Sequence, residues 1–223
     1  MSKSRYLQTL CAGFGLYWLA LALQPHDRAD WLLENTLTGV FALVLWCSRR
    51  RYPLSATAWT LLLAFALLHT LGAHYTYSLV PYEAWGQRHL GISLNGLAGW
   101  ERNNFDRVVH FLWGLLLYLP IQEGLLRGAG PFRGGWRYWF PLEFIMASSL
   151  VYELIEWAAA AVFGGELGAA YLGTQGDVWD AQKDMALATL GGIMAGILVA
   201  LLRPVGEAAA PASSPGEAPD GSK

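Results

Sequence analysis

Residues 173–184 read GTQGDVWDAQKD, and residues 185–202 continue as MALATLGGIMAGILVALL. The second stretch is almost wholly apolar, and a helix needs about 20 such residues to cross the hydrocarbon core of a bilayer. Its glycines at 191, 192 and 196 suit close contact with a neighbouring helix. The first stretch places Asp177, Asp180 and Asp184 three and four residues apart, directly before that helix. Either these acids mark the water-facing start of the helix, or they converge on a positively charged partner.

The composition of the whole chain is that of an integral membrane protein. Of its 223 residues, 54% are hydrophobic and only 14% are charged, whereas an average soluble domain carries about 25% charged residues. The apolar residues form long blocks, which predicts an all-α integral membrane protein with one transmembrane domain over residues 1–203. We predict a bundle of six transmembrane helices, at about residues 6–23, 31–48, 56–77, 105–126, 138–163 and 183–202. Residues 204–223, rich in Ala, Pro, Gly and Ser, are expected to form a disordered cytoplasmic tail.

Basic residues indicate the orientation, because loops on the cytoplasmic side carry an excess of Lys and Arg. One set of connections holds Arg49, Arg50, Arg51, Arg127, Arg133 and Arg137. Both termini are therefore expected to be cytoplasmic. A cleaved signal peptide is the alternative interpretation of the first apolar run, since that run ends in small residues. The net charge of −2 and the scattered basic residues predict no nucleic-acid partner; the lipid bilayer is the expected partner, and the oligomeric state stays open.

Acidic and histidine residues collect on the predicted outer side. With this orientation, the outer half of the protein holds His26, Asp27, His74, Asp106, His110, Glu153, Glu156, Asp177, Asp180 and Asp184. At a rise of 1.5 Å per residue, Glu153 lies roughly 15 Å below the outer end of its span and Glu156 roughly 10 Å. An ionisable side chain at such depth is costly unless it is paired, coordinated or facing water.

The spacing of these residues predicts a divalent-metal site. Asp106 and His110 are four residues apart and Glu153 and Glu156 three, so each pair shares a helix face. The three aspartates would also share a face if their helix began near residue 176. Imidazole and carboxylate ligands from neighbouring helices suit zinc, manganese or iron. The predicted metal ligands are His74, Asp106, His110, Glu153, Asp180 and Asp184.

Three further residues are predicted to support chemistry at this site. Glu156 and Asp177 are expected to act as a base or to orient the ligands, and Arg107 to bind an anionic head group. Simpler interpretations stay open, because acids such as Asp177 and Asp180 also suit the N-terminus of a helix. The deep pair of glutamates is harder to explain in that way, since two carboxylates within one turn repel unless a cation or proton separates them.

Five segments carry a resemblance to a known family: PHDR at 25–28, GAHYTY at 72–77, NFDRVVHF at 104–111, YELIEW at 152–157, and residues 173–185. Over about residues 5–203 the chain resembles the YjdF family of bacterial inner-membrane proteins, which is defined as a domain of unknown function. The resemblance implies a multi-pass protein of the inner membrane and no particular reaction. A weaker similarity to VanZ-like proteins, which are associated with glycopeptide resistance, rests on Asp106, Arg107 and His110, then Glu153, then the three aspartates.

Three functions are compatible with the sequence, and enzyme activity is left open. The first is metal-dependent hydrolysis of a lipid or cell-envelope substrate at a site near the periplasmic face. The second is an ion- or proton-coupled transporter that uses the same acids as a relay, although few polar residues continue into the cytoplasmic half. The third is a membrane assembly partner without chemistry of its own.

Overall fold

The computed structural model describes residues 3–130 and 132–202, and over these residues it contains helices and no strands. The long helices are α1 (Lys3–Ala22), α2 (Arg28–Ser48), α3 (Ala56–His74), α6 (Phe105–Gly128), α7 (Trp136–Phe163) and α9 (Asp180–Leu202). Three short helices lie in the connections: α4 (Tyr82–Leu90), α5 (Leu94–Ala98) and α8 (Gly165–Leu172). The expected tail at residues 204–223 falls outside the described residues.

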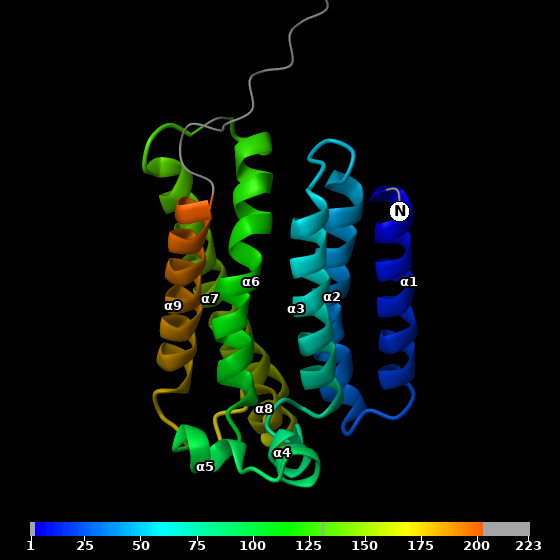
Figure 1. Ribbon diagram of the computed structural model, residues 1–223. Coiled ribbons are helices and arrows are strands. Elements are labelled where there is room, and N and C mark those ends of the chain that lie inside the picture. Colours follow the sequence, from blue (N-terminus) through cyan, green and yellow to red (C-terminus); the bar gives the residue numbers. More distant parts are fainter. Residues whose placement is uncertain (1–2, 131, 203–223) are drawn as a thin grey trace, which may run out of the picture.

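The long helices lie side by side and alternate in direction (Figure 1). Along the bundle, α1 packs on α3, α3 packs on α6, and α6 packs on both α7 and α9. The three short helices gather at one end of the bundle, and the start of α1 and the end of α9 lie at the other (Figure 1). We call the end that carries α4, α5 and α8 the capped end.

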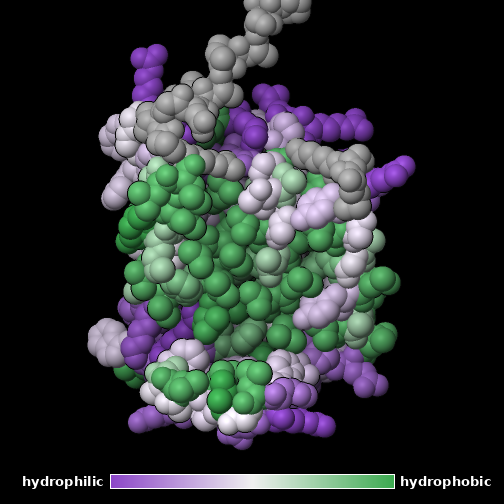
Figure 2. All heavy atoms as spheres, in the orientation of Figure 1, coloured by the Kyte–Doolittle hydropathy of each residue, from purple (hydrophilic) through white to green (hydrophobic). Residues whose placement is uncertain are grey.

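Five helices of the described chain are long and apolar enough to cross a membrane: α2, α3, α6, α7 and α9. Apolar side chains form a broad belt across the middle of the molecule, and hydrophilic side chains lie at both ends (Figure 2). The helix α1 is not among the five, although it runs alongside α3. The all-helical membrane fold is confirmed, while the sixth span and the cytoplasmic location of the termini stay predictions.

The most extensive helix contact of the described chain joins α6 to α9. A Cβ atom added to Gly114 of α6 would lie 1.9 Å from the carbonyl oxygen of Ala188 in α9. A Cβ atom on Gly191 would lie 2.1 Å from the carbonyl oxygen of Phe111 in α6. Small residues that let two backbones approach are a common basis of helix association in membranes. The prediction of close packing at the glycines of the last span is confirmed, and Gly114 is the partner position.

The start of α2 determines how deep its acids lie. The Asp27 side chain accepts hydrogen bonds from the backbone N–H groups of Ala29 at 2.8 Å and Asp30 at 2.9 Å. These bonds satisfy donors that the first turn of a helix cannot pair internally, so the helix begins at Arg28. Because this start precedes the expected span at residue 31, Glu34 lies almost two turns inside the helix.

Candidate metal centre

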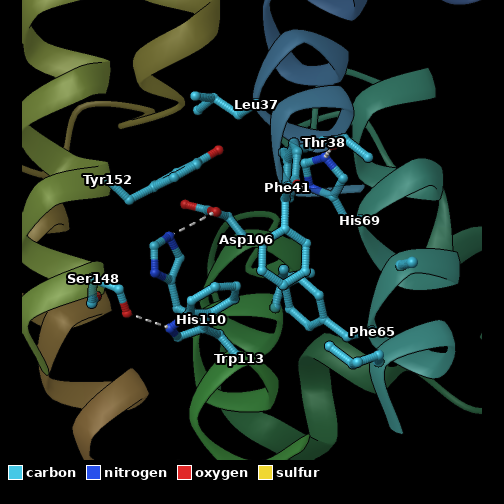
Figure 3. Close-up of a pocket in the computed structure, with 15 residues that line it drawn as sticks. Leu37, Thr38, Phe41, Phe65, His69, Asp106, His110, Trp113, Ser148 and Tyr152 are labelled. Atoms are coloured by element: carbon cyan, nitrogen blue, oxygen red, sulfur yellow. Dashed lines mark hydrogen bonds and ion pairs between the residues drawn. The ribbon is translucent and has the colours of Figure 1, made fainter. Parts of the chain in front are cut away.

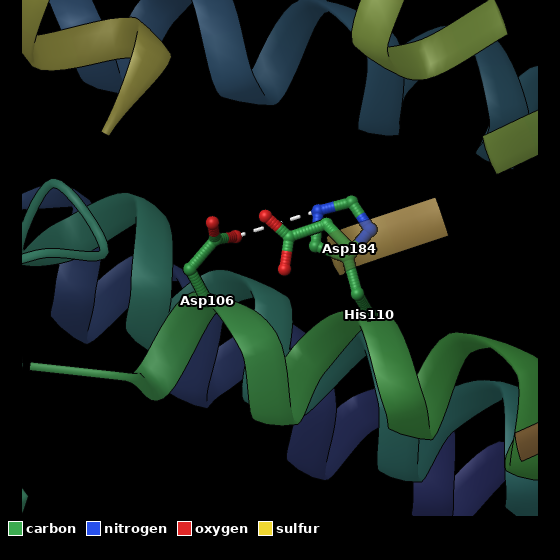
Figure 4. Close-up of side chains that lie close together, drawn as sticks. All are labelled: Asp106, His110 and Asp184. Atoms are coloured by element: carbon green, nitrogen blue, oxygen red, sulfur yellow. Dashed lines mark ion pairs between the residues drawn. The ribbon is translucent and has the colours of Figure 1, made fainter. Parts of the chain in front are cut away.

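Asp106, His110 and Asp184 bring their side chains together where α6 and α9 begin. Asp106 and His110 stand one turn apart on α6, and the close contact between the two helices places Asp184 beside them (Figure 4). One ligand atom from each residue, a carboxylate oxygen or an imidazole nitrogen, lies within 4.8 Å of the other two. The Nε2 atom of His110 is 3.5 Å from Oδ1 of Asp106. Two acids and an imidazole at this spacing form a ligand set that zinc, manganese and iron accept.

Glu153 of α7 adds a third carboxylate to this group. Its Oε1 atom is 3.6 Å from Nε2 of His110, so the imidazole lies between acids of two helices. Glu153 is 9% exposed and Asp184 is 2% exposed. Over the residues that the structure describes, neither Oε1 of Glu153 nor Oδ1 of Asp184 has a hydrogen-bond partner. Buried polar atoms are almost always paired, because leaving them unpaired is costly, so these two oxygens call for a cation or a proton.

A separate ion-pair network joins the turn before α9 to the start of α6. Asp177 forms ion pairs with Arg107 and with Lys183, whose Nζ atom lies 2.6 Å from Oδ2 of Asp177. Asp180 forms ion pairs with Arg102 and, at 3.2 Å, with Arg107. Both aspartates are thus held by cations next to the candidate ligands. The structure does not bring them into the three-residue group in which Asp180 was expected as a ligand.

The turn before α9 sets the position of Asp177. Because α9 begins at Asp180, Asp177 precedes the helix. The condition for a face shared by all three aspartates, a helix start near residue 176, is therefore not met. Gly173 and Gly176 have φ angles of +60° and +87°, a backbone conformation that favours glycine. The hydrogen bond from Lys183, followed by those from a backbone N–H and the arginine partner, holds the pKa of Asp177 well below its ordinary value.

His74 and Glu156, both predicted for the site, lie outside the three-residue group. The Nδ1 atom of His74 is 2.7 Å from the carbonyl oxygen of Leu21, so this ring links α3 to the end of α1. Glu156 is buried in α7 and lines a smaller cavity together with Asp106 and acids of α2. The structure thus places His74 in a contact between helices and Glu156 beside the candidate ligands.

Two buried acids of α2 were not predicted for the site. Asp30 is 1% exposed and Glu34 is 3% exposed, and both line the smaller cavity. The hydroxyl group of Tyr152 donates a hydrogen bond of 3.1 Å to Oε2 of Glu34. Burial, followed by the carboxyl groups of Glu34 and Glu156, raises the pKa of Tyr171 in α8. The spacing of four residues between Asp30 and Glu34 is the sequence signal that could have identified these acids. They were missed because a span expected to start at residue 31 places Glu34 at its water-facing end.

A larger cavity, of about 210 Å³, reaches the candidate ligands from the interior of the bundle (Figure 3). Its walls come from α2, α3, α6 and α7, and Asp106 and His110 are part of them. Apolar side chains such as Phe65 and Trp113 form much of the remaining wall. Side chains from four helices must be placed together to enclose this space, so no local sequence pattern predicts it.

The long apolar helices form a membrane bundle that buries carboxylates and a histidine at its capped end. The chain is therefore a polytopic membrane protein. Residues 6–204 match the family model described as "Predicted membrane protein (DUF2238)". Over 199 residues the chain is 36% identical to "Inner membrane protein YjdF" of Escherichia coli (strain K12), covering 89% of this chain and 90% of that protein. The chain belongs to this family, as its motifs predict, and is a multi-pass protein of the bacterial inner membrane.

The other comparisons add no further relative. No solved structure matches the chain. The weaker similarity to VanZ-like proteins has no support in these comparisons and stays a prediction.

Proposed function

We propose that Asp106, His110 and Asp184 bind one divalent metal ion, with Glu153 beside the fourth coordination position. The observation that carries this proposal is the pair of buried oxygens, Oδ1 of Asp184 and Oε1 of Glu153, that have no hydrogen-bond partner among the described residues. The buried carboxylates of Asp184 and Glu153 and the half-buried carboxylate of Asp106 repel each other, and burial removes much of their hydration. One bound cation would offset the repulsion and satisfy both oxygens.

The ligand chemistry favours zinc, manganese or iron. Imidazole together with carboxylates is a donor set that these ions share. A tetrahedral ion with metal–ligand distances of about 2.1 Å separates its ligand atoms by roughly 3.4 Å. The 3.5 Å between His110 Nε2 and Asp106 Oδ1 is close to that value. The three ligand atoms all lie within 4.8 Å of one another, so the side chains would move closer together to coordinate an ion.

A metal with three protein ligands supports hydrolysis, because its open position holds a water molecule. Zinc lowers the pKa of a bound water to about 7, which supplies hydroxide at neutral pH. The hydroxide oxygen would bond to the carbon or phosphorus of an ester, the bond to the leaving oxygen would break, and that oxygen would take up a proton. Glu153, whose Oε1 atom is 3.6 Å from Nε2 of His110, would accept a proton from that water, and Glu156 follows it on α7 as a second proton acceptor. The proposed substrate is a lipid or another component of the cell envelope.

The ion-pair network suggests positioning roles for Asp177 and Arg107. Since Asp177 is held by Arg107 and Lys183, it is a poor candidate for the base that was expected here. Its contacts hold the turn before α9 against the start of α6, and this fixes Asp184 opposite His110. Arg107 would bind an anionic head group only by exchanging its aspartate partners for the substrate.

A proton or ion relay has less support. A relay needs polar groups that continue toward the other end of the bundle. There, Oε2 of Glu123 accepts a hydrogen bond of 2.7 Å from the backbone N–H of Ser55 and lies 3.0 Å from Arg127. Glu143 accepts a hydrogen bond of 2.6 Å from Trp139. These acids make local contacts and do not extend a relay. A membrane assembly partner without chemistry would give no role to the unpartnered oxygens of Asp184 and Glu153.

The test is the metal content of the purified protein after incubation with zinc, manganese or iron(II) salts and removal of unbound ions. Mass spectrometry is expected to find about one ion per chain in the wild type. Asp184→Asn and His110→Ala remove a ligand each and should lose at least about tenfold in metal affinity, as a lost ligand or its orienting partner costs 10–100-fold. The matched control is Glu166→Gln, at an exposed position outside the site, which should keep the metal. Folded wild-type protein that binds none of the three ions would contradict the proposal.

A further inference from the structure

The 210 Å³ cavity lies inside the part of the bundle that crosses the membrane. The helix α2 packs mainly on α3 and α8, whereas α7 packs mainly on α6, α8 and α9. The cavity lies between these two groups of helices and takes side chains from both (Figure 3). Phe41 of α2, which lines it, is also exposed on the outside of the bundle. The cavity wall is therefore part of a surface that lipid covers.

The cavity is polar at one end and apolar at the other. Along α6 its lining runs from Asp106 to Trp113, a length of roughly 10 Å at 1.5 Å per residue. Near the capped end it meets Asp106 and His110, and toward the middle of the bundle it meets Leu62 and Phe65. An amphiphilic ligand would match this change of polarity along its length.

The polar end has its own hydrogen-bonded wall. His69 of α3 links Thr38, 2.5 Å from its Nε2 atom, to the hydroxyl group of Tyr77 at its Nδ1 atom. Both imidazole nitrogens are thus engaged, so the His69 ring has no free nitrogen for an occupant, whereas Asp106 and His110 line the same end of the cavity. The apolar end includes the hydroxyl groups of Ser149 and of Ser148, which accepts a hydrogen bond of 3.2 Å from Trp113. Its other lining side chains are apolar, so it is poorly suited to water, since a buried water needs about two to four polar contacts.

We propose that this cavity holds one acyl chain of a bilayer lipid, with the ester or phosphoester region of that lipid at Asp106, His110 and Asp184. The surrounding solvent of α2 and α7 is hydrocarbon, so an acyl chain can enter between them without crossing water. That the bound lipid is also the substrate rests on the proposed hydrolytic function. As a statement about binding, the inference rests on the cavity alone.

The experiment uses full-length protein in vesicles that contain phosphatidylglycerol with a photoactivatable diazirine in the middle of one acyl chain. After illumination and digestion, peptide mass spectrometry is expected to find adducts at Phe65 or Trp113. Ala66→Phe fills the cavity and should reduce these adducts at least about fivefold, because the added ring and the acyl chain would over-pack the same space. Ala42→Phe, the same change at an exposed position of α2, is the matched control and should leave them unchanged.

The outcomes separate this inference from the proposed metal site. Asp184→Asn is expected to lose the metal and to keep the adducts in the cavity. Adducts without any metal in the wild type would sink the hydrolytic function and leave the lipid site standing, and a metal without adducts would do the reverse. Adducts spread evenly over lipid-facing residues would overturn the lipid site. Leu37→Trp, from the part of the wall that α2 forms, replaces Ala66→Phe if that variant does not fold.

Discussion

The acids at the capped end differ in the charges that surround them. Asp177 and Asp180 each contact at least two basic side chains, so their charges are compensated within the protein. Asp184 and Glu153 are also buried, and each leaves an oxygen without a partner among the described residues. Asp177 and Asp180 therefore stabilise the start of α9, whereas Asp184 and Glu153 are the acids that a bound cation would stabilise most.

Asp177 should make the stability of the protein sensitive to acid. Its pKa is held below the ordinary value of 3.8, so the folded state favours the ionised form. A group of this kind stabilises the protein fully above its unfolded pKa, and the contribution is lost as the pH falls toward the folded pKa. Asp177→Asn should therefore lower the melting temperature at pH 7, and its difference from the wild type should shrink below about pH 4.

Thermal unfolding in detergent, followed by circular dichroism over this pH range, would measure the effect. Glu101→Gln, at an exposed position, is the control and should show no comparable difference at pH 7. A difference between Asp177→Asn and the wild type that stays constant down to pH 3 would show that the ion pairs are not its cause.

Among the helices, the contact between α6 and α9 has the least tolerance for added volume. Gly114→Ala would place a methyl group against the backbone of α9, and Gly191→Ala would place one against the backbone of α6. Either change should lower the free energy of unfolding by about 3 kcal/mol, the upper end for over-packing, because backbone cannot rotate away. It should also separate Asp184 from His110 and weaken metal binding.

Gly124→Ala is the matched control for these variants, since nothing lies within 4 Å of a Cβ atom at that position. It should be neutral or slightly stabilising, because Ala is about 1 kcal/mol better than Gly in a helix. Equal stability of Gly114→Ala and Gly124→Ala in a denaturation series would refute the close contact. If a destabilised Gly114→Ala protein still bound the metal, the close contact between α6 and α9 would not be required for metal binding.

The helices themselves could largely be predicted from the sequence, and their starts could not. The length of each apolar run determines how many residues can cross the bilayer as a helix. The cores of the expected spans therefore coincide with helices. The first residue of a helix depends on capping bonds instead. The bonds at Asp27 lengthen α2 and bury Glu34, and the turn at Gly176 leaves Asp177 outside α9. A shift of three residues is enough to change which acids face the core.

For the whole molecule, the orientation in the membrane stays a prediction from the positive-inside rule. In a background of Cys11→Ser and Cys47→Ser, Glu166→Cys would test the capped end and Arg133→Cys the other end; both positions are exposed. A membrane-impermeant maleimide should label Glu166→Cys in intact spheroplasts and label Arg133→Cys only after the membrane is permeabilised. The reverse pattern would place the candidate metal centre on the cytoplasmic side.

The sequence predicts part of the candidate site because helical spacing and topology are local properties. Asp106 with His110, and the burial of Glu153, follow from spacing and depth alone. The exclusion of His74 does not, since it depends on the contact between α3 and the end of α1. The choice of Asp184 over Asp180 depends on Arg102 and Arg107, which arrive from a different part of the chain. Pairing across helices is a tertiary property that one sequence does not encode in its spacing.

The position of Asp184 in the last described helix has a consequence for biosynthesis. Helices α6 and α7 enter the membrane first and bring Asp106, His110 and Glu153 with them. Until α9 follows, a nascent chain carries these groups without Asp184 and without the glycine contact that holds them in place. Metal loading would then be a late step of maturation, and a chain truncated before α9 would expose an incomplete set of acids to the membrane.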